Sequence, residues 1–126
     1  MGATTVWEHW DSVDENGKMW STDMNSFNHY AYGSVFDWIY GDMLGIKVCD
    51  DGAAYTKVEI APLTDKRIGF AEGSIDTRNG KIAVSWRYIG DKVRYEIIVP
   101  ENVTATIRIA GMSDKTVKGG AYTIVK

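Results

Sequence analysis

Residues 46–126 consist of short runs in which apolar and polar residues alternate, separated by Gly, Asp and Asn. Alternation with a period of two places successive side chains on opposite faces of an extended strand, so each run predicts a strand with one buried face. Runs of this kind joined by tight turns pair as consecutive hairpins. We therefore expect this part of the chain to form an antiparallel β-sandwich.

Five or six strands are expected, with turns at defined positions. Asn79-Gly80 predicts a type I′ hairpin turn, Gly90-Asp91 predicts a second tight turn, and Pro100 ends a strand. Weaker strand candidates are residues 68–77 and 122–125. The residues expected to face the core are Val58, Ile60, Ile82, Val84, Trp86, Tyr88, Val93, Tyr95, Ile97, Val99, Val103, Ala105, Ile107 and Ile109.

The first 45 residues differ in composition, since they contain four of the five tryptophans and both histidines. One long helix is predicted from Ser26 to Leu44, with Asn25 as N-cap and Gly45 as the residue that ends it. Its apolar residues lie around most of the circumference, which is the pattern of a buried helix. Asn25, His29 and Tyr32 would then share one face near the helix start.

An acidic residue between two tryptophans is the main candidate for chemistry. Glu8 lies between Trp7 and Trp10, and a polar loop, residues 11–23, separates this segment from His29. Indole rings pack on the apolar face of a sugar ring, while a carboxylate and an imidazole act on its hydroxyls or on a water. The residues alone leave the alternatives open that Glu8 is a surface or capping residue, that the tryptophans belong to a core and that His29 only forms hydrogen bonds.

Two sequence motifs indicate a family. The runs GATTVWEHWD, residues 2–11, and NSFNHYAYG, residues 25–33, resemble the end of the catalytic domain of bacterial α-L-rhamnosidases, inverting glycoside hydrolases that release terminal rhamnose. The resemblance continues more loosely through the β-rich remainder. It implies that residues 1–45 are the C-terminal end of an α/α-barrel catalytic domain and that residues 46–126 are a C-terminal β-sandwich domain. The expected fold is mostly β, an antiparallel β-sandwich preceded by one long helix left over from an α/α barrel.

The same resemblance implies roles for individual residues. It makes Glu8 the general base, and it makes His29 a contact of the bound rhamnose, with Trp7, Trp10 and Asn25 as further substrate-binding residues. An inverting enzyme also needs a general acid ~6.5–9.5 Å from the base, and in the family an earlier part of the barrel supplies it. The residue after the glutamate is commonly Arg in the family and is His9 here, so a different charge environment is expected for Glu8.

The net charge and the composition exclude several classes of binding partner. The net charge of −3 gives no basic surface for nucleic acid, and no apolar run reaches the ~18 residues of a membrane span. No cofactor is expected, and no metal site is expected because His9 and His29 have no further ligand at suitable spacing. The expected partner is a rhamnose-containing saccharide. A homo-oligomer through residues 1–45 is also expected when the chain is isolated.

A function of a different class stays open from the sequence. The chain would in that case be a noncatalytic β-sandwich module that binds carbohydrate or another partner. Trp86 and Tyr88 are the residues that would form a sugar platform in such a module, although the alternation of their strand places both on the core face.

Overall fold

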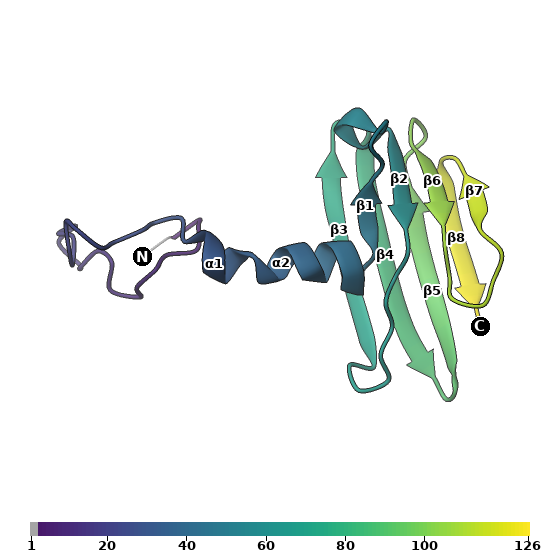
Figure 1. Ribbon diagram of the computed structural model, residues 1–126, viewed down its shortest axis with the longest axis horizontal. Coiled ribbons are helices and arrows are strands. Elements are labelled where there is room, and N and C mark those ends of the chain that lie inside the picture. Colours follow the sequence, from purple (N-terminus) through teal and green to yellow (C-terminus); the bar gives the residue numbers. More distant parts are fainter. Residues whose placement is uncertain (1–2) are drawn as a thin grey trace. The chain divides into compact units, whose positions relative to one another are not determined.

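The structure, a computed structural model, describes residues 3–126 and divides into two compact units, one up to Asp37 and one from Trp38 to Lys126. Strands make up most of the regular structure, and all of them belong to the second unit (Figure 1). The helical turns are α1 Tyr30–Gly33, α2 Val35–Trp38, a π-helical turn Ile39–Met43 and a 3-10 turn Ala53–Tyr55. The strands are β1 Ile46–Val48, β2 Lys57–Ile60, β3 Phe70–Thr77, β4 Gly80–Ile89, β5 Lys92–Val99, β6 Thr104–Ile107, β7 Lys115–Val117 and β8 Gly120–Val125.

The second unit is a sandwich of two four-stranded sheets, which confirms the predicted fold class (Figure 1). One sheet has the strand order β1-β2-β6-β7 and the other has the order β3-β4-β5-β8. The prediction of a wholly antiparallel sandwich is wrong for one pair, because β2 and β6 run parallel. Strands β3, β4 and β5 all lie in the other sheet, so the chain returns to β2 by a crossover, and a crossover connection joins parallel strands.

Alternating residues from both sheets fill one core. The predicted inward faces of β4 and β5 are confirmed, with Tyr88 partly buried at the end of its row. Trp86 is 1% exposed, and its indole N–H donates to the Met43 carbonyl at 2.8 Å. That bond satisfies the one polar atom of a buried tryptophan. The buried core residues are Leu44, Ile46, Val58, Ile60, Ala71, Ile82, Val84, Trp86, Val93, Tyr95, Ile97, Val99, Val103, Ala105, Ile107, Ile109 and Val117.

Tight turns join the strands of the second sheet. The hairpin at Asn79-Gly80 is confirmed, since Thr77 pairs with Gly80 across it. Its predicted type is wrong, because the two residues between Thr77 and Gly80 are Arg78 and Asn79, and neither has the positive φ that a type I′ turn needs at both central positions. Gly80 alone takes the positive φ, of 114°. The second turn is confirmed at Gly90-Asp91, with a φ of 65° at Gly90.

The predicted helix Ser26–Leu44 is wrong at its start and in its continuity. Helical structure begins at Tyr30, so Asn25 is not the N-cap, and His29 in that position has an extended conformation and no side-chain cap bond. The carbonyls of Ser26 and Phe27, which a helix over these residues would use for its own hydrogen bonds, instead accept from Glu8 and Thr5. Asn25 therefore shares no helix face with His29 and Tyr32. The helix is also not buried in this chain, since Tyr30 is 85% exposed and Phe36 is 53% exposed.

Gly45 ends the helical segment as predicted. Its φ of 72° is the left-handed conformation that glycine adopts after a last helical turn. A Cβ at this position would also overlap the Ala61 carbonyl and the nitrogen of Pro62. Gly45 is thus required both by its backbone conformation and by the close approach of another segment.

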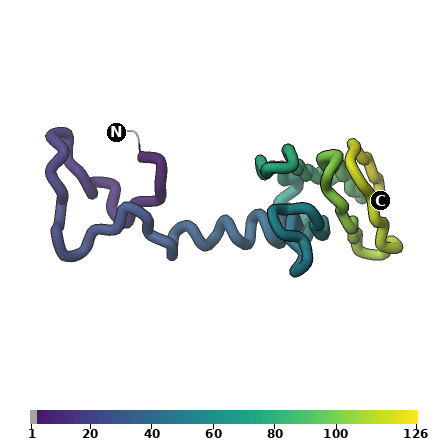
Figure 2. Tube along the Cα trace, turned by 90° about the horizontal axis from the view of Figure 1, so that it is seen from above, coloured from purple at the N-terminus to yellow at the C-terminus, as the bar shows by residue number. Residues whose placement is uncertain are grey.

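The first unit is built mainly from loops, and the trace becomes helical only at Tyr30 (Figure 2). The predicted loop over residues 11–23 is confirmed. One carboxylate oxygen of Asp14 accepts the backbone N–H groups of Asn16 and Lys18, at 2.9 and 2.8 Å. An Asp that bonds its own turn in this way stabilises a loop rather than a helix.

Candidate active site

Two segments of the first unit are held together by backbone hydrogen bonds. The Glu8 amide donates to the Ser26 carbonyl at 2.8 Å, and the His29 amide donates to the Val6 carbonyl at 2.7 Å. The Thr5 hydroxyl adds a bond to the Phe27 carbonyl. These contacts bring the glutamate of the first motif and the histidine of the second motif to one place.

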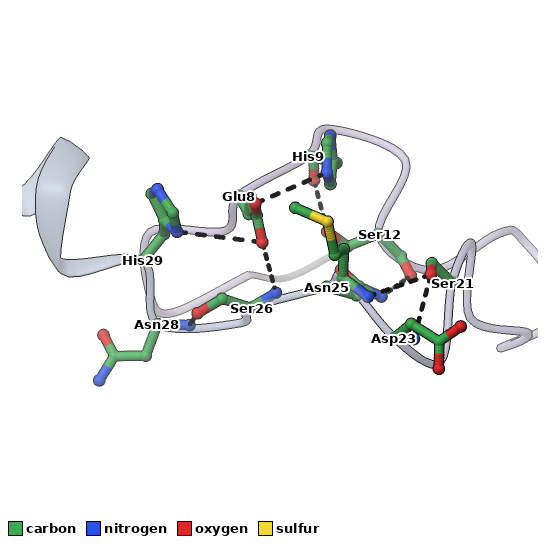
Figure 3. Close-up of polar contacts among 10 residues, drawn as sticks. Glu8, His9, Ser12, Ser21, Asp23, Asn25, Ser26, Asn28 and His29 are labelled. Atoms are coloured by element: carbon green, nitrogen blue, oxygen red, sulfur yellow. Dashed lines mark hydrogen bonds and ion pairs between the residues drawn. The ribbon is translucent and has the colours of Figure 1, made fainter.

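The Glu8 carboxylate lies between two imidazoles (Figure 3). Its Oε2 accepts the backbone N–H of Ser26 at 3.0 Å and lies 3.9 Å from Nδ1 of His29. Its Oε1 lies 3.9 Å from Nε2 of His9. Neither imidazole is within hydrogen-bonding distance, so the Ser26 amide is the one direct donor to this carboxylate among the described residues.

The Glu8 side chain is 18% exposed, and those of His29 and His9 are 26% and 35% exposed. The carboxylate is therefore mostly enclosed but still reachable from solvent. With Oε2 fixed by a backbone N–H, Oε1 is left with acceptor capacity for a further proton donor such as a water. An oriented carboxylate with one free oxygen can take a proton from that water.

A buried serine and Asn25 brace the loop that follows Glu8. Ser12 is 0% exposed, and its hydroxyl donates to the His9 carbonyl at 2.7 Å. The side-chain amide of Asn25 donates to the Ser12 carbonyl at 2.9 Å. Its Oδ1 is buried and has no hydrogen-bond partner among the described residues. In this chain Asn25 thus contacts the loop, while its predicted contact with substrate stays a prediction.

The predicted aromatic residues lie in different environments. Trp7 is partly buried and packs edge-on against Phe27, with ring centroids 5.2 Å apart, whereas Trp10 is 100% exposed. The alternative that the tryptophans of this segment all belong to a core is therefore wrong, because Trp10 is exposed. A full indole exposed to solvent is unusual for a large apolar side chain. Trp10 is available for a sugar ring or for another part of a larger protein.

Sequence reasoning missed three contributors to this site. Ser26 acts through its backbone N–H, and such a role leaves no signal in residue type. Ser12 is an ordinary loop serine until its burial is known. Trp20, whose ring lies 4.5 Å from that of His9, is an aromatic residue in a polar loop, and that contrast was the one signal available.

The described residues contain no group of three or more His, Cys, Asp or Glu side chains arranged to hold a metal ion. No helix in that part of the chain is long and apolar enough to cross a membrane. The sugar platform considered for a noncatalytic module is not available, because Trp86 is buried and Tyr88 packs against the core.

Comparison with known families gives two matches that divide the chain. Residues 1–43 match the bacterial alpha-L-rhamnosidase 6 hairpin glycosidase domain, and residues 45–123 match the bacterial alpha-L-rhamnosidase C-terminal domain. The two matches thus define a class of proteins in which a 6 hairpin glycosidase domain is followed by a C-terminal domain. The chain belongs to the bacterial α-L-rhamnosidase family.

Curated relatives are similar over most of this chain. An alpha-L-rhamnosidase of Alteromonas sp. (strain LOR) is 42% identical over 82% of the chain, which corresponds to 11% of that protein. An alpha-L-rhamnosidase of Formosa agariphila is 35% identical over 93% of the chain and 12% of its own length. The chain therefore spans about a tenth of the length of the curated relatives it matches.

Solved structures agree in fold. The alpha-L-rhamnosidase of Streptomyces avermitilis, solved with L-rhamnose, has a TM-score of 0.72 and 28% identity, covering 98% of this chain and 14% of that one. The enzyme of Aspergillus terreus has a TM-score of 0.73 with the same identity and coverage.

Proposed function

We propose that this chain is part of an α-L-rhamnosidase that hydrolyses terminal α-L-rhamnosyl linkages with inversion, and that Glu8 is its general base. The observation that supports this is the Glu8 carboxylate, whose Oε2 is oriented by the Ser26 amide (Figure 3) and whose Oε1 accepts no hydrogen bond from the described residues. In this mechanism Glu8 takes a proton from the water that attacks the anomeric carbon, on the face of the sugar opposite the leaving group.

His29 has the role of a substrate contact in this proposal. It lies beside the carboxylate, with Nδ1 3.9 Å from Oε2, and its ring can bond a sugar hydroxyl. The exposed Trp10 and the half-enclosed Trp7 offer apolar surface to the sugar ring. The general acid, which protonates the leaving oxygen, is assigned to another part of the enzyme, as is most of the pocket. The domain boundary between residues 45 and 46 belongs to the same proposal.

The test uses the complete enzyme that contains this chain. Glu8→Gln should lower kcat by ~10²–10⁴-fold with little change in substrate binding, because a base acts in the transition state. His29→Ala should weaken binding as well. Glu15→Gln, an exposed change in the neighbouring loop, is the matched control and should leave kcat unchanged.

Inversion is tested separately from the identity of the base. Proton NMR of an aryl α-L-rhamnoside digest, read before mutarotation, should show β-rhamnose as the first product. Near-normal kcat in Glu8→Gln would remove the general-base assignment, and α-rhamnose as first product would remove inversion.

A further inference from the structure

The outer face of the second sheet carries a hollow that lies outside the Glu8 site. Its walls come from three neighbouring strands, β3, β4 and β5 (Figure 1). In one row across the sheet Phe70 pairs with Arg87, which pairs with Arg94. In the next row Glu72 pairs with Ser85, which pairs with Glu96. The short Ser85 thus lies among five long side chains, and this difference in length forms the β3–β5 hollow.

The charges of the β3–β5 hollow cancel. Two guanidinium groups, Arg87 and Arg94, lie beside two carboxylates, Glu72 and Glu96, and one pair of them is joined, with Arg94 bonded to Glu96 at 2.7 Å. An anionic ligand would meet the carboxylates and a cationic ligand would meet the guanidinium groups. Like-charge contacts of that kind are unfavourable. The balance therefore favours a ligand that is neutral and polar.

Several groups in the hollow are free to bond such a ligand. Within the part of the chain that the structure describes, neither the Glu72 carboxylate nor the Ser85 hydroxyl has a hydrogen-bond or ion-pair partner. Glu72 offers hydrogen-bond acceptors, Ser85 offers both a donor and an acceptor, and the arginines keep N–H groups that make no hydrogen bond. Sugar hydroxyls donate and accept at once, so alternating carboxylate, hydroxyl and guanidinium groups suit adjacent hydroxyls of a sugar.

An aromatic wall and the size of the hollow agree with this chemistry. Phe70 is 50% exposed, and the Arg87 guanidinium lies 4.6 Å from its ring centroid. That contact favours this arrangement of the two side chains by ~0.5–1 kcal/mol at an exposed site. The volume of about 240 Å³ is below the ~300–1,000 Å³ of pockets for drug-sized ligands, which matches one sugar residue rather than a long chain.

We propose that the β3–β5 hollow binds one residue of a neutral saccharide. The ligand class rests on the side chains of the hollow and does not depend on Glu8 as a base. In an enzyme that acts on glycans, such a site would hold a saccharide through residues other than those of the Glu8 site. A few hydrogen bonds to a neutral ligand on an exposed face give weak binding, with Kd on the order of millimolar.

The test is a titration of the ¹⁵N-labelled chain, followed by NMR, with methyl α-L-rhamnoside, methyl β-D-glucoside and methyl β-D-galactoside. At least one glycoside should shift the amide signals of β3, β4 and β5 around Glu72, Ser85 and Glu96. The absence of shifts with all three would overturn the proposal. Shifts confined to the segment around Glu8 would also overturn it, because they would place the sugar in the other site.

Matched variants locate the binding. Glu72→Ala should weaken it about tenfold, the loss expected for a hydrogen bond to a charged group, while the exposed Glu101→Ala should not change it. Ser85→Leu should abolish binding by filling the hollow, while Thr106→Leu, on the outer face of β6, should preserve it. Thermal melts of all four variants separate loss of binding from loss of fold. Unchanged binding in folded Ser85→Leu would overturn the proposal. Glu8→Gln should bind the glycoside as the wild-type chain does, because binding in the hollow does not depend on the catalytic role proposed for Glu8.

Discussion

Individual side chains of this protein take their roles from backbone groups near them. The Glu8 carboxylate is oriented by the Ser26 amide, and the side-chain N–H of Asn25 bonds the Ser12 carbonyl. A similar dependence is found in the loop after β1, where Ala54 and Tyr55 have positive φ, of 54° and 63°. The Ala54 carbonyl there accepts the side-chain amide of Asn79 at 2.8 Å. A β-carbon makes this conformation costly, so the loop is held by its surroundings.

Ala54→Gly should stabilise the protein by about 0.5–1 kcal/mol, because glycine removes the steric cost of left-handed φ and its greater freedom in the unfolded state offsets part of the gain. Ala53→Gly is the control, since Ala53 is exposed in the same loop and is not among the residues with positive φ. It should destabilise by a similar amount. Urea unfolding at equilibrium measures the free energy of unfolding of both variants. A loss of stability in Ala54→Gly would contradict the inference that the backbone at Ala54 is strained.

Among the elements, the junction between the helical segment and β1 depends on one residue. Gly45→Ala should destabilise by ~2–4 kcal/mol, because a Cβ adds backbone strain and overlaps the Ala61 carbonyl. Gly69→Ala is the matched control. Gly69 has a φ of 81° but no atom within 4 Å of an added Cβ, so strain alone should cost about 1–2 kcal/mol. Equal losses in the two variants, measured by thermal melting, would show that the overlap relaxes without cost.

The exposed helical turns predict self-association of the isolated chain. Tyr30, Tyr32, Val35 and Phe36 are all at least half exposed, and contiguous apolar surface of this kind usually finds a partner. The same surface on a second copy gives a two-fold contact. Sedimentation at micromolar concentration should show a dimer or larger species. Val35→Glu with Phe36→Glu should return it to a monomer, and a monomeric wild-type chain would contradict the inference.

How far the sequence predicts these elements depends on how local the determining contacts are. The turns and inward-facing residues of β4 and β5 follow from the sequence because alternation and a tight turn specify a hairpin within a short stretch. Strands β1 and β7 have three residues each, which is too short for a periodic pattern. The helix start was misplaced because residues 26–29 pair with the Glu8 segment, a contact that residue types do not reveal. The meeting of Glu8 and His29 was predicted from the family resemblance, while the donor from Ser26 was not.

For the whole molecule, we expect the isolated chain to be inactive. Removing the general acid alone costs ~10²–10⁴-fold in rate, and most of the proposed pocket belongs to parts outside this chain. Release of nitrophenol from an aryl α-L-rhamnoside should not exceed that of the Glu8→Gln chain. Turnover by the pure chain that Glu8→Gln abolishes would contradict this expectation.

The parallel pairing of β2 with β6 also sets the order in which the sandwich can assemble. Val58 pairs with Ala105, 47 positions later, and the whole β3–β4–β5 meander lies between them. Closing that loop costs entropy before any contact compensates for it, whereas each hairpin of the meander closes over a few residues. During synthesis the meander therefore folds first. The part of its apolar face that β6 and β7 cover then stays open until those strands have been made, and this interval is when the domain is most exposed to aggregation.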